Sequence, residues 1–266
     1  MKQLLSPLYL HKRLSLTLVL LAAFIWSLFS VTWSRDLLHA GGWATTVQIL
    51  EGLIKPDLSP DILELAVESS WVTVVYAVTG MTVALIIAFV LGVLGSGVLV
   101  SSRPVRIVTA GFSRAVLAII RAIHELVWAL LFVAVIGLSP YAAIFALGIP
   151  YGGILGRIFA DMLNDVPGEP IQALRAAGAS RLHCLMYGYL PLIRSNMISY
   201  TMYRFECSIR SSAIMSFVGL GGLGYQIQLS LADLHYDEVW TFLFFLIAIV
   251  VLIDAWSNSL RKRLVL

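Results

Sequence analysis

Apolar residues along this chain gather into six long stretches, and most charged residues fall in the segments between them. The stretches cover residues 14–31, 71–100, 107–138, 141–159, 191–218 and 239–256. A helix needs about 20 mostly apolar residues to cross the hydrocarbon core of a bilayer. The pattern therefore predicts an all-α integral membrane protein, built as a bundle of six spans. The third and fifth stretches exceed this length, so we expect them to be tilted, broken or partly interfacial.

The composition supports this prediction and excludes a soluble class. Hydrophobic residues make up 59% of the chain, charged residues only 12%, and the mean hydropathy is +0.90. Soluble domains carry about 25% charged residues. No segment has the polarity of a separate water-soluble domain, so we predict one membrane domain over residues 1–266, with the bilayer as a partner and no nucleic acid. Within it we distinguish a first span with an external segment (1–70), a core (71–260) and a polar loop (165–191).

Lysine and arginine residues are distributed unevenly between the two sides of the six predicted spans. One side carries Lys2, Lys12, Arg13, Arg103, Arg106, Arg175, Arg181, Arg261, Lys262 and Arg263. Loops rich in these residues face the cytoplasm in multi-span membrane proteins. We therefore predict a multi-pass membrane protein with both termini and the loop at 165–191 in the cytoplasm. The apolar run after Lys12 and Arg13 is too long for a secretory signal and is expected to stay as the first span.

A further helical pattern lies in the external segment, where Trp43, Val47, Leu50 and Ile54 recur at helical spacing. It predicts an interfacial helix between Gly42 and Pro56. Such a helix either seals the outer edge of the bundle or presents its acidic rim to a soluble partner. The pattern leaves both alternatives open.

Three glycines in the fourth predicted span recur every four residues, at Gly148, Gly152 and Gly156. They share one helix face, and small residues at this spacing allow two helix backbones to approach closely. We predict that this face packs against another helix, either inside the bundle or in a second subunit. Pro150 is expected to add a kink.

Residues 165–191, which we name the docking segment, form the most structured of the predicted polar loops. Pro170 can start a short helix, Gly178 can end it in a left-handed turn, and Ser180 can cap a second helix that ends at Gly188. Ala173 keeps the surface low enough for a partner to approach closely. We therefore predict a docking element, with charge at its edge from Arg175 and Arg181.

The spacing of the docking segment resembles a motif of the transmembrane subunits of binding-protein-dependent ATP-binding-cassette importers. Their cytoplasmic loop reads Glu-Ala-Ala, three residues, Gly, nine residues, Ile, one residue, Leu-Pro. This chain has Gln172-Ala173-Leu174, Gly178, Gly188 and Leu190-Pro191 at the same spacing. Gln172 and Gly188 depart from the motif, and Glu169 is close enough along the chain to replace the missing charge.

A narrower resemblance, covering about residues 107–240, is to the phosphonate importer permeases. It rests on the stretches 124–131, 203–211 and 218–224. The glycine-rich third stretch is also similar to methionine importers. The resemblance implies transport of a phosphonate or related phosphorus oxyanion, and the alternatives are another small solute such as methionine or a stand-alone secondary transporter. A secondary transporter is expected to show inverted repeats, and we find no convincing repeat in the sequence.

The resemblance further implies a location in the bacterial inner membrane and the fold of a type I importer permease, in which the docking segment is a coupling helix for a cytoplasmic ATPase. The expected partners are two ATPase subunits, a second permease subunit, identical or homologous, and a periplasmic substrate-binding protein. The chain has no Gly-x-x-x-x-Gly-Lys-Ser/Thr motif, so ATP and Mg are assigned to the ATPase and this chain is predicted to be non-catalytic, without a cofactor of its own. The implied coupling residues are Gln172, Ala173, Arg175, Gly178, Arg181, Leu190 and Pro191.

Ionisable residues within the predicted spans are candidates for the substrate path, because such groups usually face a bundle interior or a water-filled route. Glu206 and Arg210 are four residues apart and are predicted to pair, with Arg204 nearby. Alternatively, an arginine presents its charge to a passing oxyanion. We expect His124 and Glu125 to join this network. A His-Glu pair without a second histidine does not predict a metal site.

Glycines at positions 219, 221, 222 and 224 follow the fifth predicted span. Their freedom at positive φ predicts a break in the helix at its outer end. The break forms either an outer gate or an ordinary tight turn. The residues of this glycine segment are Gly219, Gly221, Gly222 and Gly224.

Overall fold

The computed structural model describes residues 6–30 and 42–265, and all regular structure in these residues is helical. The chain divides into two compact units, Met1–Gln48 and Ile49–Leu266. Each unit is described by itself. The prediction of one domain stays a prediction, and Lys2 and the end of the first predicted span at residue 31 lie outside the described residues.

The first unit contains helix α1 (Ser6–Ser30) and the start of α2 (Gly42–Ile54). Every described side chain of α1, from residue 13 onward, is exposed within the unit. Its hydroxyl groups bond inside the helix, since Thr17 Oγ1 donates to the carbonyl of Arg13 at 2.8 Å and Ser30 Oγ to that of Trp26 at 2.9 Å. An apolar helix whose polar groups are satisfied internally suits a bilayer, in agreement with the predicted first span.

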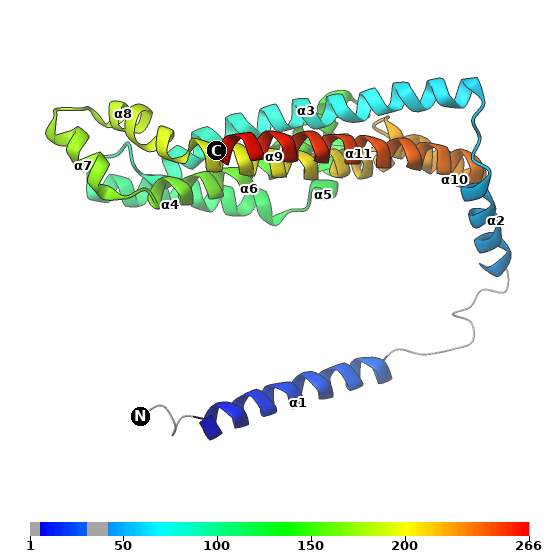
Figure 1. Ribbon diagram of the computed structural model, residues 1–266, viewed down its shortest axis with the longest axis horizontal. Helices are drawn as coiled ribbons and strands as arrows, with labels where there is room; N and C mark the ends of the chain where they lie inside the picture. The colour runs from blue at the N-terminus through cyan, green and yellow to red at the C-terminus, as the bar shows by residue number, and fades with distance from the viewer. Residues whose placement is uncertain (1–5, 31–41, 266) are drawn as a thin grey trace. The chain divides into compact units, whose positions relative to one another are not determined.

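The second unit is a bundle in which the long helices α3, α6, α9 and α11 run alongside one another (Figure 1). The short helices α7 and α8 lie at one end of these long helices, and α10 lies at the other. The helices of this unit are α3 (Pro60–Ser96), α4 (Arg103–Ala122), α5 (Glu125–Ile136), α6 (Pro140–Asn164), α7 (Gly168–Ala176), α8 (Arg181–Cys184), the π-helical turn η2 (Leu185–Tyr189), α9 (Leu190–Met215), the 3₁₀ turn η3 (Ser216–Val218), α10 (Leu223–Ala232) and α11 (Tyr236–Val265).

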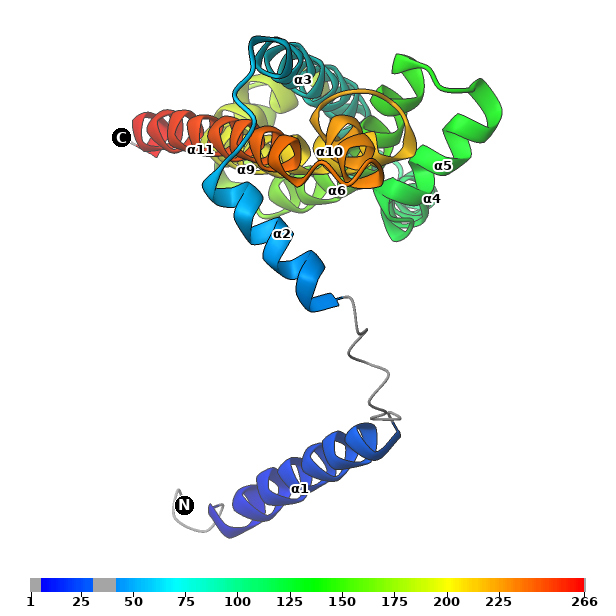
Figure 2. The ribbon, with the colours of Figure 1, turned by 90° about the vertical axis from the view of Figure 1, so that its right-hand side faces the viewer.

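In the described part of the chain, four helices are long and apolar enough to cross a membrane, and two bent helix pairs raise the number to six. One pair is α4 and α5, which meet at 88° and diverge clearly in the end-on view of Figure 2. The other joins the segment Arg181–Val218 to α10 with a bend of 43°. The structure thus agrees with six spans, and of the alternatives left open for the third and fifth spans it shows a break in each. The predicted start of the second span at residue 71 is wrong, because Pro60 begins a helix whose polar first turns carry Asp61 and Glu64.

The glycines of α6 lie in close contact with neighbouring helices. A Cβ atom at Gly148 would lie 2.8 Å from Cβ of Val83, and one at Gly152 would lie 2.8 Å from Cβ of Ile87. At Gly156 it would lie 3.2 Å from Cα of Ala88. The prediction of close packing is confirmed, and the partner is α3 of the same chain. Helix α6 continues through Pro150.

The helix predicted between Gly42 and Pro56 is confirmed as α2. Within the second unit, the last residues of α2 lie against the start of α11. A Cβ atom at Gly52 would lie 2.7 Å from the carbonyl oxygen of Tyr236, and Trp240 Nε1 donates to the carbonyl of Ile49 at 2.6 Å. These contacts fix the residues just before α3 to the same end of the bundle as α10.

Candidate functional site

The docking segment begins with α7, which starts two residues earlier than predicted, at Gly168 instead of Pro170. Pro170 still lies in the first turn, where a backbone N–H would have no acceptor within the helix, so proline loses no hydrogen bond there. The predicted left-handed turn at Gly178 is confirmed by its φ of +85°. Ser180 is confirmed as the cap of the next helix, since its Oγ accepts a hydrogen bond from the backbone N–H of His183 at 3.3 Å.

The prediction that the second short helix ends at Gly188 is wrong. Helix α8 continues through η2 into α9 without a break, and the backbone N–H of Leu190 bonds to the carbonyl of Leu185, five residues earlier. A glycine ends a helix where it takes up positive φ, and Gly188 is not among the glycines that do so. The π turn instead leads directly into Pro191 in the first turn of α9.

The missing side chain of Gly188 serves the packing of α7. A Cβ atom at this position would lie 2.7 Å from Cδ1 of Ile171 and 2.8 Å from Cδ1 of Leu174. Both residues belong to α7, and Ile171 is buried. Helix α7 is therefore seated directly on the turn that leads into α9. This contact also gives a physical reason for the departure from the Ile of the family motif, because a branched side chain would fill the space that α7 occupies.

The remaining predicted coupling residues are mostly exposed. Gln172, Ala173, Arg175 and Gly178 are exposed. Arg181 is partly buried, and its Nη1 donates to the carbonyl of Val100 in the α3–α4 turn at 2.7 Å. Of the two residues that end the segment, Leu190 is partly buried and Pro191 exposed. Helix α7 thus has a buried face toward the bundle and an exposed face that is free of bulky side chains at its centre. Contact of this exposed face with an ATPase stays a prediction.

The predicted ion pair between Glu206 and Arg210 is wrong. Glu206 is buried and pairs with Arg261 of α11, with 2.6 Å between Oε1 and Nη2. The same Nη2 also donates to Asn258 Oδ1 at 2.9 Å. The guanidinium of Arg210 lies instead near Cys207, at 3.5 Å from its Sγ. The i,i+4 rule compares residues on one helix only, and here the neighbouring helix supplies a cation that comes closer.

Arg204 also forms no ion pair with Glu206 in the described part of the chain and contacts tyrosines instead. Its Nε and Nη2 donate to the hydroxyl of Tyr200 at 3.1 and 2.7 Å. The guanidinium carbon lies 5.3 Å from the ring centroid of Tyr200 and 5.6 Å from that of Tyr203, within the range of cation–π attraction. Arg204 is therefore held by aromatic residues of its own helix.

Glu125 joins α9 through a serine, so the predicted partners of the His124–Glu125 pair are wrong. Ser211 Oγ donates to Glu125 Oε1 at 2.7 Å and lies 2.9 Å from the hydroxyl of Tyr151. Because Ser211 has one hydroxyl proton and donates it to Glu125, Tyr151 donates to Ser211. His124 caps α5, with Nδ1 accepting from the backbone of Leu126 at 3.2 Å, and its Nε2 lies 3.7 Å from Glu125 Oε2. One hydroxyl thus ties α5, α6 and α9 together at the break in the third span.

The predicted break after the fifth span is confirmed, with φ of +89° at Gly219, +81° at Gly221 and +90° at Gly222. The same expectation is wrong for Gly224, which is helical and lies in α10. A side chain there would overlap the backbone of Ala213, so the residue serves close packing of α10 on α9.

Helix α3 anchors this glycine segment through two residues. Thr73 Oγ1 accepts from the backbone N–H of Leu223 at 3.0 Å, and the hydroxyl of Tyr76 donates to the carbonyl of Leu220 at 2.9 Å. The turn is therefore fixed to the bundle at two points. A gating role for it stays a prediction.

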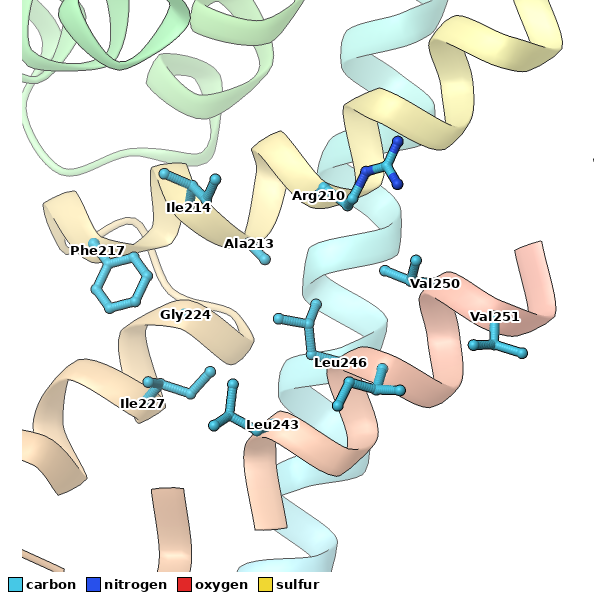
Figure 3. A pocket seen from close by; sticks show the side chains of 11 residues that line it. Arg210, Ala213, Ile214, Phe217, Gly224, Ile227, Leu243, Leu246, Val250 and Val251 are labelled. Atoms are coloured by element: carbon cyan, nitrogen blue, oxygen red, sulfur yellow. The ribbon is translucent and has the colours of Figure 1, made fainter. Parts of the chain in front are cut away.

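Arg210 lines an apolar groove of about 390 Å³ (Figure 3). Arg210 lies at one edge of it on α9, and the other lining residues are apolar or glycine and come from α9, η3, α10 and α11. Figure 3 shows Ile227 and Leu243 facing each other across the groove from α10 and α11. The predicted path residues are thus not gathered in one place: Glu125, Arg204, Glu206 and Arg210 each have different neighbours.

Three contact residues of these helices were missed by sequence reasoning. Ser211 contacts the predicted residue Glu125, Tyr151 contacts Ser211, and Arg261 contacts the predicted residue Glu206; each lies 55 or more residues from its partner. No local spacing rule connects such positions. Only the repeated hydroxyl residues at 208, 211 and 212 within an apolar helix hinted at polar contacts of α9.

Comparison with known proteins finds one matching family and several similar permeases. Residues 94–265 match the model of a family described as binding-protein-dependent transport system inner membrane component. The chain is 35% identical to the phosphite transport system permease protein PtxC of Stutzerimonas stutzeri over 58% of this chain and 56% of PtxC, so it spans little more than half of that relative. It is 30% identical to the putative phosphite transport system permease protein HtxC of the same organism, over 94% of this chain and 86% of HtxC.

Solved structures resemble the fold at lower identity. The inward-facing MetNI methionine ABC transporter matches 78% of this chain and 99% of its own chain, with a TM-score of 0.68 and 20% identity. An amino acid ABC transporter matches 76% of this chain and 94% of its own, with a TM-score of 0.62 and 16% identity. These matches confirm the predicted helical fold of an importer permease.

Proposed function

The chain belongs to the family of binding-protein-dependent transport system inner membrane components, and from this we propose that it moves a phosphonate or related phosphorus oxyanion across the inner membrane. It acts as the permease subunit of an ATP-driven importer. The names of its relatives support the substrate class, because they refer to phosphite, phosphate and phosphonate transport. The likeness to the methionine transporter is one of fold, at 20% identity, and does not favour methionine as substrate.

The observation that best supports the mechanism is the close packing of α7 against Gly188. A rigid helix that is packed on a continuous turn can transmit a rigid-body movement, whereas a flexible loop would absorb it. The exposed side of α7, with Gln172 and Ala173 at its centre, is the surface for an ATPase. ATP and Mg are held by that partner, present in two copies, and this chain performs no catalysis.

Movement of α7 reaches the membrane through α9, which continues from η2 without interruption. Along its length α9 contacts α5 and α6 through Ser211 and contacts α11 through Glu206. Both contacts are polar, and their side chains can exchange partners. A shift of α9 therefore changes the positions of α5, α6 and α11 relative to α9. In this way ATP-driven closure of the partner opens the path alternately to the two sides, with a second permease subunit completing it. The arginine-rich end with the docking segment faces the cytoplasm, and the opposite end receives substrate from a periplasmic binding protein.

Co-purification of the ATPase tests the docking surface. A complex of the full chain with its ATPase is expected to be lost when Ala173→Glu and Gly178→Glu are combined. Arg103→Gln, an exposed change on α4 outside the docking segment, is the matched control and is expected to retain the complex. An undisturbed complex in the double variant would overturn the assignment of α7 as the coupling helix.

Uptake by the reconstituted complex tests the substrate. Proteoliposomes with both partners are expected to take up labelled phosphite, phosphate or methylphosphonate in an ATP-dependent and saturable manner. Methionine is expected to compete with none of them. Saturable methionine uptake without uptake of any phosphorus oxyanion would contradict the proposal.

A further inference from the structure

A small polar cavity lies at the α7 end of the second unit, apart from the intramembrane charges. Its volume is about 200 Å³, far above the roughly 10–15 Å³ that a single water needs. It is partly open and is lined by the α3–α4 turn, the end of α6, the docking segment and the start of α4. Three arginines from separate elements line it: Arg106 of α4, Arg175 of α7 and Arg181 of α8.

The local backbone brings Arg106 into this cavity. Gly97 ends α3 in a left-handed turn with φ of +70°. A Cβ atom at Gly97 would lie 2.6 Å from Cγ of Arg106 and 3.1 Å from its Cδ. The stem of Arg106 therefore lies directly on the glycine, in space that any side chain would occupy. Both the positive φ and the close approach require glycine at position 97. Without a side chain there, the stem of Arg106 can lie against the backbone.

The cavity has positive charge without a compensating carboxylate. No Asp or Glu is among its described lining residues, and neither Arg106 nor Arg175 forms an ion pair in the described part of the chain. Arg181 uses one of its five N–H groups on the carbonyl of Val100. By contrast, Arg157 and Arg261 each pair with a carboxylate. Like charges that converge on one cavity repel one another, and a bound anion removes this repulsion.

We propose that this cavity binds a phosphate-type oxyanion between Arg106, Arg175 and Arg181. The guanidinium group is planar and matches two oxygens of such an anion at once, and it stays charged at every physiological pH. Hydroxyl groups of Ser101 and Tyr189 also line the cavity and are suitable donors. The anion is either free in solution or the phosphate of a lipid head group, since the chemistry is the same.

An anion held there bridges the α3–α4 turn and the docking segment. Helix α3 belongs to the tightly packed α3–α6 pair, whereas the docking segment leads into α9. Occupancy therefore restrains α7 and α8 relative to the rest of the bundle. The consequence, lower ATP-driven transport when the site is filled, rests on the proposed function; the binding itself does not.

Binding of labelled inorganic phosphate to the purified full chain in detergent tests the site. Saturable binding is expected, and Arg106→Gln is expected to weaken it at least tenfold. Arg103→Gln is the matched control, because Arg103 lies one turn away on α4 and does not line the cavity. Gly97→Ala is a second test, since it displaces the stem of Arg106 and leaves every charge in place. Thermal unfolding of each variant shows whether its fold is kept.

A lipid source is tested by native mass spectrometry of the chain with phosphatidylglycerol or phosphatidylcholine vesicles. Retention of phosphatidylglycerol that is lost in Arg106→Gln, with weak binding of free phosphate, assigns a lipid head group. Free phosphate binding that is lost in the same variant assigns a soluble anion. If neither probe binds, or if both bind equally well to the Arg106→Gln variant, the site does not exist. Uptake by the complex is measured separately, so loss of the proposed transport activity would leave the binding result standing.

Discussion

Helices α6 and α9 have nearly the same length, 25 and 26 residues, but they are held in opposite ways. Helix α6 presents glycines to α3, and backbone and side-chain atoms of the two helices meet with no space for a further Cβ. Helix α9 is held by polar side chains, through Ser212 to α3, Ser211 to α5 and α6, and Glu206 to α11.

The difference distinguishes a fixed frame from a movable element. Interlocked small residues resist sliding, because any displacement produces overlap or a void. Hydrogen bonds and ion pairs of long side chains can be exchanged for others at a similar free energy, provided that each buried group finds a new partner. Helix α9 is also the helix into which the docking segment leads. In the proposed mechanism, α3 and α6 therefore form the frame and α9 is the element that moves.

The largest effect is expected from a side chain in the frame. Gly92→Leu would place its Cβ 2.9 Å from the carbonyl oxygen of Gly156 and 3.1 Å from Cβ of Phe159, so α3 and α6 must separate. Overpacking of this kind costs about 1–3 kcal/mol for small insertions and more for a whole leucine. We expect almost no folded protein by size-exclusion chromatography. The control is Gly111→Leu on α4, where a Cβ atom meets nothing within 4 Å; equal yields would contradict the rigid frame.

A smaller effect is expected from the ion pair of α9 with α11. Arg261→Gln leaves Glu206, whose side chain is only 8% exposed, without its cation. Loss of one partner from a buried pair destabilises by about 3–5 kcal/mol. The comparison is Arg157→Gln, which removes the more accessible i,i+4 pair with Asp161 and should change stability by about 0.3–0.5 kcal/mol. Thermal unfolding in detergent measures both, and equal shifts would show that Glu206 does not depend on α11.

The smallest effect is expected at the hydroxyl that joins three helices. Ser211→Ala leaves Glu125 and Tyr151 without their shared partner, at a cost of about 1–3 kcal/mol. Ser208→Ala is the matched control, because Ser208 is buried on the same helix but donates only to the carbonyl of Phe205. Thermal unfolding should separate the two variants. If they unfold at the same temperature, the junction between α5, α6 and α9 is not held by this serine.

The sequence was sufficient for features that depend on neighbouring residues. Apolar length predicted six spans and a third span that is tilted, broken or partly interfacial, glycine spacing predicted the packing face of α6, and the turn at Gly178 and the cap at Ser180 were predicted from residue type. Each of these follows from conformational preferences within one or two helical turns.

The contacts between distant segments could not be predicted in the same way. Glu206 has an arginine four residues later, so local spacing favoured Arg210, whereas the structure supplies Arg261 from 55 residues away. Glycine often ends a helix, so the sequence predicts a helix end at Gly188. Its actual function, to make room for Ile171 and Leu174, depends on how α7 folds back, which no spacing within the segment reveals.

The central claim is that the docking segment and α9 move as one body through the contact at Gly188, and the coupling of ATP hydrolysis to uptake tests it most directly. Gly188→Leu would push α7 away from η2, whereas Gly168→Leu adds the same side chain at the start of α7, where a Cβ atom meets only Gln172 Nε2 at 3.5 Å. In the reconstituted importer, the account predicts that Gly188→Leu hydrolyses ATP with little uptake of phosphorus oxyanion, while Gly168→Leu keeps the parental ratio. An unchanged ratio of uptake to hydrolysis in a folded Gly188→Leu variant would contradict it.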